Sequence, residues 1–241
     1  MHSGFKNILV WMTLFSMAMA FLESAVVVYL RELYYPQGFC FPLVTLPAKI
    51  ALTEFLREMA TLIMLLAAGY IAGRQTDRWV AWFIYSFAVW DIFYYVYLKI
   101  LLNWPDSWLT WDILFLIPVI WTGPVIAPIL VSFTMILLSG LILYYSEKHG
   151  KLVNSNPALI LLIAGSVLVF LSFIWDFSSF MSRHYSSGAF LHPEISSQAV
   201  RQYIPMYFKW GLFWTGEGTI ITGIVLLFVK NQKIKADVEQ S

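Results

Sequence analysis

The chain has 241 residues, of which 60% are hydrophobic and only 12% charged, and its mean hydropathy is +0.72. A soluble domain carries about 25% charged residues, so this composition excludes a globular domain with a water-facing surface. The formal net charge of +1 provides no basic field that could hold a nucleic acid. Cys40 is the only cysteine, which excludes an internal disulfide and any cysteine-based metal site. We therefore expect one integral membrane domain over residues 1–241, with the lipid bilayer as its surroundings.

Six apolar stretches are long enough to cross a bilayer, whose hydrocarbon core of about 30 Å requires roughly 20 helical residues. The first could be mistaken for a cleavable signal peptide, because Lys6 precedes an apolar run that contains an Ala-x-Ala site at 18–20. The apolar run continues to Leu30, however, which favours an uncleaved span. The predicted spans are residues 7–30, 48–73, 79–101, 125–146, 154–180 and 204–229.

The region between the third and fourth spans is unusual. The 34 residues from Ile113 to Ser146 are uncharged and would extend about 51 Å as a helix, too far for one span. Prolines at 118, 124 and 128 interrupt them and disfavour a continuous helix. We expect the Trp-rich residues 104–122 to form an interfacial or re-entrant segment, which would line a cavity if it dips into the membrane. The predicted fold is thus an all-α, polytopic membrane helix bundle of about six transmembrane helices plus this segment.

The orientation of the spans follows from lysine and arginine residues in short loops, which favour the cytoplasmic side. A cytoplasmic N-terminus places three clusters of basic residues inside, at 74–78, 148–151 and 230–235. Several of the basic residues on the other side belong to the spans themselves. We therefore expect a multi-pass protein of the cell or inner membrane, with both termini in the cytoplasm.

Acidic residues within the apolar spans are the most informative feature of the sequence. Counted at 1.5 Å per residue from the nearest predicted cytoplasmic lysine or arginine, all of them lie about 20–30 Å away, in the outer third of the bilayer. An ionised acid at the centre of a membrane helix costs about 2.5–3.5 kcal/mol, so such residues face the bundle interior or a water-filled cavity. These acids are Glu23, Glu54, Glu58, Asp91 and Glu217.

Groups that could stabilise these acids occur at the same depth. Arg57 shares a helix face with Glu54 and Glu58, because residues three or four apart are neighbours on a helix. Asp91, Tyr95 and Lys99 form a similar stripe on the third span. We expect a substrate- or ion-binding site centred on Glu54, Arg57 and Glu58. Its candidate residues are Glu23, Glu54, Arg57, Glu58, Asp91, Tyr95, Lys99 and Glu217.

Several chemistries are excluded by residues that the spans lack. None of the four histidines falls within a span, which excludes bis-histidine haem ligation across the bilayer. The sequence contains no His-Glu-x-x-His, Walker A or Gly-x-Ser-x-Gly motif. We predict no metal and no cofactor, and no catalytic residue can be named.

The leading functional hypothesis is binding or transport of a small polar solute or protons at the acid-rich site. The first alternative is an accessory or structural subunit of a larger membrane complex, in which intramembrane charges pair with a partner protein or a second copy of the chain. The second alternative is a membrane enzyme that uses an intramembrane carboxylate as a general base. A cleft that reaches Glu58 and Glu217 would favour transport or catalysis, whereas acids that are all paired internally would favour a structural role.

Overall fold

The structure is a computed structural model that describes residues 3–73, 78–149, 155–185 and 198–239. Within them, six helices are long and apolar enough to cross a membrane, which confirms the predicted all-α, multi-pass membrane bundle. These helices are α1 (Ser3–Tyr34), α2 (Ala48–Gly73), α3 (Trp79–Leu102), α4 (Ile126–His149), α5 (Asn156–His184) and α7 (Trp210–Glu239).

The helix boundaries differ from the predicted spans mainly at α7, which begins at Trp210 rather than at residue 204. Pro205 accounts for the difference, since proline disfavours the helical conformation in the residue before it. Residues 203–209 accordingly run without regular structure into α7. The first helix is longer at both ends than the predicted span of residues 7–30.

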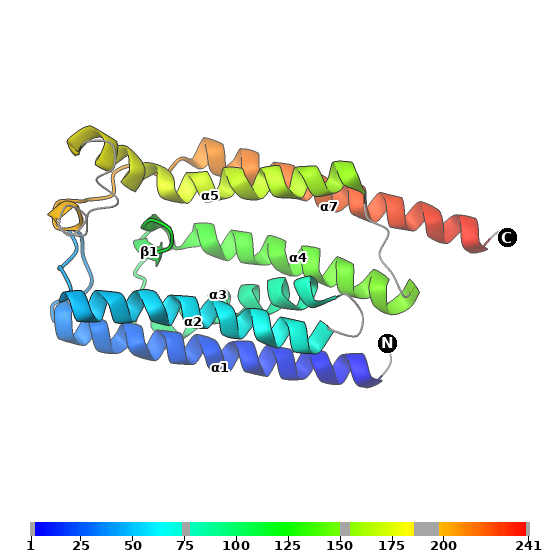
Figure 1. Cartoon of the computed structure of the whole chain (residues 1–241), viewed down its shortest axis with the longest axis horizontal. Coiled ribbons are helices and arrows are strands. Elements are labelled where there is room, and N and C mark those ends of the chain that lie inside the picture. The colour runs from blue at the N-terminus through cyan, green and yellow to red at the C-terminus, as the bar shows by residue number, and fades with distance from the viewer. Residues whose placement is uncertain (1–2, 74–77, 150–154, 186–197, 240–241) are drawn as a thin grey trace.

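The helices lie roughly along the long axis of the molecule, and both chain ends lie at the same end of it (Figure 1). Helices α1, α2 and α4 each pack against α3, while α5 packs mainly against α7. The α5–α7 contact is close because it is made at glycines. A Cβ atom on Gly165 would lie 2.7 Å from the carbonyl oxygen of Gly216, and one on Gly216 would lie 2.8 Å from the backbone nitrogen of Val169.

Residues 104–122 do not form a span. They include β1 (Trp111–Phe115), which pairs antiparallel with β2 (Trp121–Pro124) in a short hairpin at the end of the bundle opposite the termini (Figure 1). The hairpin is held on one side by Trp121, whose ring stacks on Phe173 of α5 at a centroid distance of 6.1 Å. The non-spanning segment was expected from the sequence, but its strands were not.

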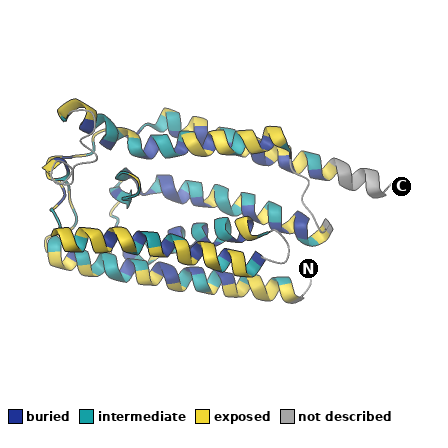
Figure 2. Ribbon diagram, in the orientation of Figure 1, coloured by how far each residue is buried: buried dark blue, intermediate teal, exposed yellow. Residues whose placement is uncertain are grey.

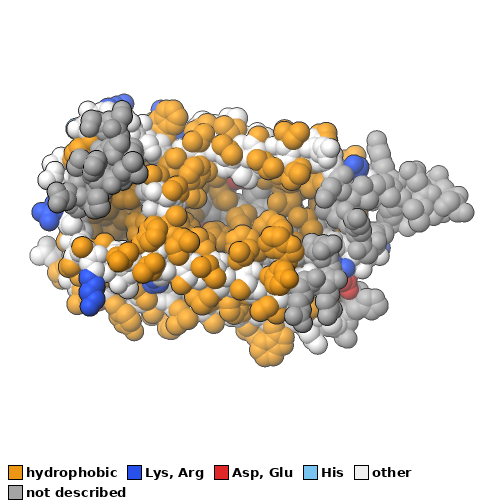
Figure 3. Space-filling view, in the orientation of Figure 1, with side chains coloured by type: hydrophobic (Ala, Val, Ile, Leu, Met, Phe, Trp, Pro, Cys, Tyr) orange, Lys and Arg blue, Asp and Glu red, His pale blue; other side chains and the backbone are white. Residues whose placement is uncertain are grey.

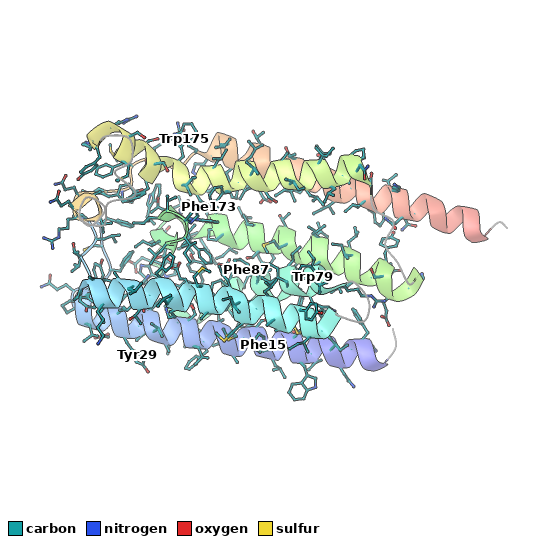
Figure 4. All side chains as sticks on the ribbon, viewed as in Figure 1. Phe15, Tyr29, Trp79, Phe87, Phe173 and Trp175 are labelled. Atoms are coloured by element: carbon teal, nitrogen blue, oxygen red, sulfur yellow. The ribbon has the colours of Figure 1, made fainter. Side chains whose placement is uncertain are left out.

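The outer faces of the helices carry exposed apolar side chains, whereas buried residues face the bundle interior (Figure 2). Trp11 and Ile71 are 71% and 68% exposed, values that suit contact with lipid tails rather than water. Apolar side chains cover the middle of the molecule, and lysine and arginine appear towards its two ends (Figure 3). Tyr29 projects away from the bundle, while Phe173 points towards the hairpin (Figure 4). The lipid-facing surface and the internal core are thus clearly separated.

Candidate functional site

A cavity of about 460 Å³ lies at the end of the bundle that carries the hairpin, and we call it the end cavity. Its walls come from α1, α2, the hairpin and the connection between α1 and α2, with Tyr94 contributed by α3. Most of the lining side chains are apolar, including Val27, Leu30, Leu43 and Leu116. Five charged residues complete the lining: Arg31, Glu54, Arg57, Glu58 and Asp112.

Arg57 forms two ion pairs beside the end cavity. Its Nε donates to Glu54 Oε2 at 2.8 Å, the contact expected from their spacing of three residues on α2. Its Nη1 donates to Glu23 Oε1 on α1, and the other Glu23 oxygen accepts a 3.1 Å hydrogen bond from Thr61. Arg57 therefore neutralises carboxylates from two helices and joins α1 to α2.

Glu58 is in a different environment from Glu54, although both lie on α2. Its Oε2 accepts a hydrogen bond of 3.0 Å from the backbone N–H of Leu116, the residue that follows β1. The residue is 8% exposed, and in the part of the chain that the structure describes it has no ion pair. Glu58 is thus a buried carboxyl group in the cavity wall that is held by a backbone amide rather than by a cation.

Arg31 and Asp112 form the second charged contact of the end cavity. Their Nη2 and Oδ1 atoms are 3.3 Å apart, and both side chains are more than nine-tenths buried. The guanidinium group lies 3.8 Å from the ring centre of Trp104 and 4.5 Å from that of Phe39, within the range of cation–π attraction. Burial raises the pKa of Asp112 to about 6, and the nearby Arg31 charge opposes this shift only in part.

Asp112 was missing from the residues expected at the site. The depth of an acid can be counted along a helix, but Asp112 lies on a strand, where that count does not apply. The sequence feature that could have indicated Asp112 is its position between Trp111 and the long uncharged run that begins at Ile113. Tyr95, which was expected at the site, donates to Asp112 Oδ2 at 3.3 Å from behind the cavity wall.

Asp91 and Glu217 lie outside the end cavity. Asp91 on α3 accepts a 2.8 Å hydrogen bond from Ser132, and Glu217 on α7 accepts one of 2.6 Å from Thr134, both on α4. Neither residue lines the cavity. The acids expected at one site therefore divide into two groups, Asp91 and Glu217 in contact with α4, and Glu23, Glu54 and Glu58, which α1 and α2 bring together beside the end cavity.

Lys99 forms no ion pair with the acids that it was expected to accompany, among the residues that the structure describes. Its Nζ donates to the carbonyl oxygens of Asn103 and Pro105, at 3.1 and 3.0 Å, just beyond the end of α3. These carbonyls are typical partners for a basic residue in the last turn of a helix. We interpret Lys99 as a residue that stabilises the helix end.

These features define an integral, multi-pass membrane protein with a charged and largely apolar cavity between its helices and a hairpin. No known protein family, curated protein or solved structure matches the chain.

Proposed function

We propose that this membrane protein binds a small amphiphilic molecule in the end cavity. The observation that carries the proposal is the meeting of five charged residues from three parts of the chain with apolar side chains around one space of about 460 Å³. Cavities that bind small molecules typically measure about 300–1,000 Å³, with mostly apolar walls and a few polar groups that orient the ligand. The end cavity has both properties.

The apolar part of the cavity wall restricts the class of ligand that was expected from the sequence. A small polar solute or a proton would interact with the charged residues but would leave Leu30, Leu43 and Leu116 facing unfilled space. A molecule with one polar end and an apolar body would cover these side chains, at about 25 cal/mol for each Å² of apolar surface removed from water. We therefore favour an amphiphile.

A structural role is the second candidate, and the ion pairs themselves favour it. Arg57 joins α1 to α2, and Arg31 joins α1 to the hairpin, so these contacts hold the bundle together without a ligand. Both members of each ion pair belong to this chain, so a partner protein is not needed to neutralise them. The structural role, however, offers no reason for a cavity beside the charges.

The orientation is also proposed rather than observed. The even number of spans and the common end of the termini in Figure 1 support a shared side for both termini. With the termini in the cytoplasm, as the basic clusters indicate, the end cavity belongs to the extracytoplasmic side of the bilayer.

Photolabelling can test ligand binding at this position. We would reconstitute the protein in lipid nanodiscs, add a medium-chain alkyl alcohol that carries a diazirine, irradiate, and locate the adducts by peptide mass spectrometry. Adducts concentrated on Glu54 and Glu58, and reduced by an excess of the unlabelled alcohol, are expected. Adducts spread over lipid-facing residues such as Ile71, with no enrichment at the cavity, would contradict the proposal.

A further inference from the structure

Building on the proposed function, we infer that the ligand of the end cavity is a zwitterion: an apolar body that carries an ammonium group and an anionic oxygen. Two groups in the cavity wall lead to this inference. Within the described part of the chain, Glu58 has no ion pair, and one nitrogen of Arg31 has no hydrogen-bond acceptor.

An ionised Glu58 would leave an excess of negative charge around the end cavity, which a cation could balance. Among the residues that the structure describes, four carboxylates lie in or beside the cavity, those of Glu23, Glu54, Glu58 and Asp112, and two guanidinium groups form ion pairs with three of them. Arg57 pairs with Glu23 and Glu54, and Arg31 pairs with Asp112, so that among the described residues Glu58 is held by the Leu116 amide and by no cation. A carboxylate in a low-dielectric site is stabilised by a cation at short distance. An ammonium group on the ligand would supply this cation.

Arg31 requires an acceptor. Its Nη1 is buried and has no hydrogen-bond partner among residues 3–73, 78–149, 155–185 and 198–239. The guanidinium group is held between Phe39 and Trp104 and by Asp112, so it cannot easily turn towards another acceptor. Charged oxygens are the strongest acceptors for arginine, and Arg31 is one of the residues that line the end cavity.

A zwitterion satisfies both groups at once. A ligand with a net negative charge would add to the excess of carboxylates, and a simple amine would leave Arg31 Nη1 without an acceptor. The apolar residues Val27, Leu30 and Leu43 would then contact the body of the ligand. Two sources have this chemistry, a free amino acid with an apolar side chain and the head group of a phosphatidylethanolamine.

Four probes of related shape and one short-chain lipid distinguish these possibilities by isothermal titration calorimetry on the whole protein in nanodiscs. L-phenylalanine carries both charges, phenethylamine only the ammonium, hydrocinnamate only the carboxylate, and phenethyl alcohol neither. Dihexanoyl phosphatidylethanolamine represents the lipid source. We expect one zwitterionic probe to bind about ten-fold or more tightly than each singly charged analogue, since hydrogen bonds to charged groups are worth that much or more.

Two variants then locate the ammonium group. Glu58→Gln should weaken binding of the zwitterion and of phenethylamine by about ten-fold while leaving hydrocinnamate binding unchanged or improved. Glu217→Gln, which alters a buried acid outside the cavity, should change none of these affinities. Equal losses in both variants would contradict the assignment to Glu58.

The probes also separate failure of this inference from failure of the proposed function. Binding of L-phenylalanine identifies a free zwitterion, and binding of the phosphatidylethanolamine alone identifies the lipid head group. If phenethylamine, hydrocinnamate or phenethyl alcohol binds as tightly as either zwitterion, the inference is wrong while the cavity remains a ligand site. If no probe binds, the proposed function itself is contradicted.

Discussion

The contacts of Arg57 show which parts of the candidate site can be predicted from the sequence. Its pairing with Glu54 follows from their spacing along one helix and could be predicted. Its contact with Glu23 depends on how α1 packs against α2, and the contact between Arg31 and Asp112 joins residues 81 positions apart. A pattern in one sequence reports neighbours on the same helix, whereas contacts between helices depend on packing that the pattern does not specify.

Loss of Arg57 should destabilise the protein, because it would leave the buried Glu54 and the partly buried Glu23 without a cation. We expect Arg57→Gln to cost roughly 2–3 kcal/mol, less than the 3–5 kcal/mol typical of a fully buried pair, since solvent screens a partly exposed side chain. The free energies of unfolding of the wild type and the variant in detergent micelles would measure this loss of stability. The matched control is Lys99→Gln at the exposed end of α3, which should cost less than about 1 kcal/mol. Similar losses for both variants would rule out a special role for Arg57.

Asp112 should make stability depend on pH. Its pKa is raised to about 6 in the folded protein, whereas an unfolded aspartate titrates near 3.9. The folded state therefore binds this proton more tightly, so the contribution of Asp112 to stability is greatest below pH of about 4 and declines as the pH rises to about 6. The stability of the wild type minus that of Asp112→Asn should fall over this window in pH-dependent melting curves. A difference that stays constant from pH of about 4 to 7 would show that Asp112 keeps its ordinary pKa.

At the scale of whole elements, hydropathy predicted the spans well, because an apolar run of about 20 residues has few other uses. It did not predict the hairpin, since strands of five and four residues carry too little alternation to be recognised. Prolines and a long uncharged run indicated only that residues 104–122 are not a span. The hairpin matters for the site because it contributes Asp112 and the Leu116 amide.

Two glycines of α7 should respond in opposite ways to alanine. A Cβ on Gly216 would lie 2.8 Å from Val169 of α5, whereas Gly218 has no such neighbour within 4 Å. We expect Gly216→Ala to destabilise the protein by about 1–3 kcal/mol through overpacking, and Gly218→Ala to stabilise it by about 0.4–1 kcal/mol through backbone entropy. Thermal unfolding of both variants checks this. If the two substitutions change stability alike, α5 and α7 do not pack through Gly216.

At the scale of the molecule, six helices that all cross the membrane would place both termini on one side, and the native cysteine can report which side that is. Cys40 is exposed in the connection between α1 and α2, at the end opposite the termini, and Ser155 precedes α5 at the other end. A membrane-impermeant maleimide should label Cys40 in intact cells. In a Cys40→Ser, Ser155→Cys variant it should label only permeabilised cells. The reverse pattern would place the termini outside.

The central claim, that the end cavity holds a ligand, is tested most directly by filling the cavity. Ala51 lines it, while the adjacent Leu52 is 59% exposed and does not. In the photolabelling experiment, Ala51→Trp should remove most of the adducts on Glu54 and Glu58, because the indole ring would occupy the space of the probe. Leu52→Trp should leave their yield unchanged. If Ala51→Trp folds normally and is labelled as strongly as Leu52→Trp, the end cavity is not a ligand site.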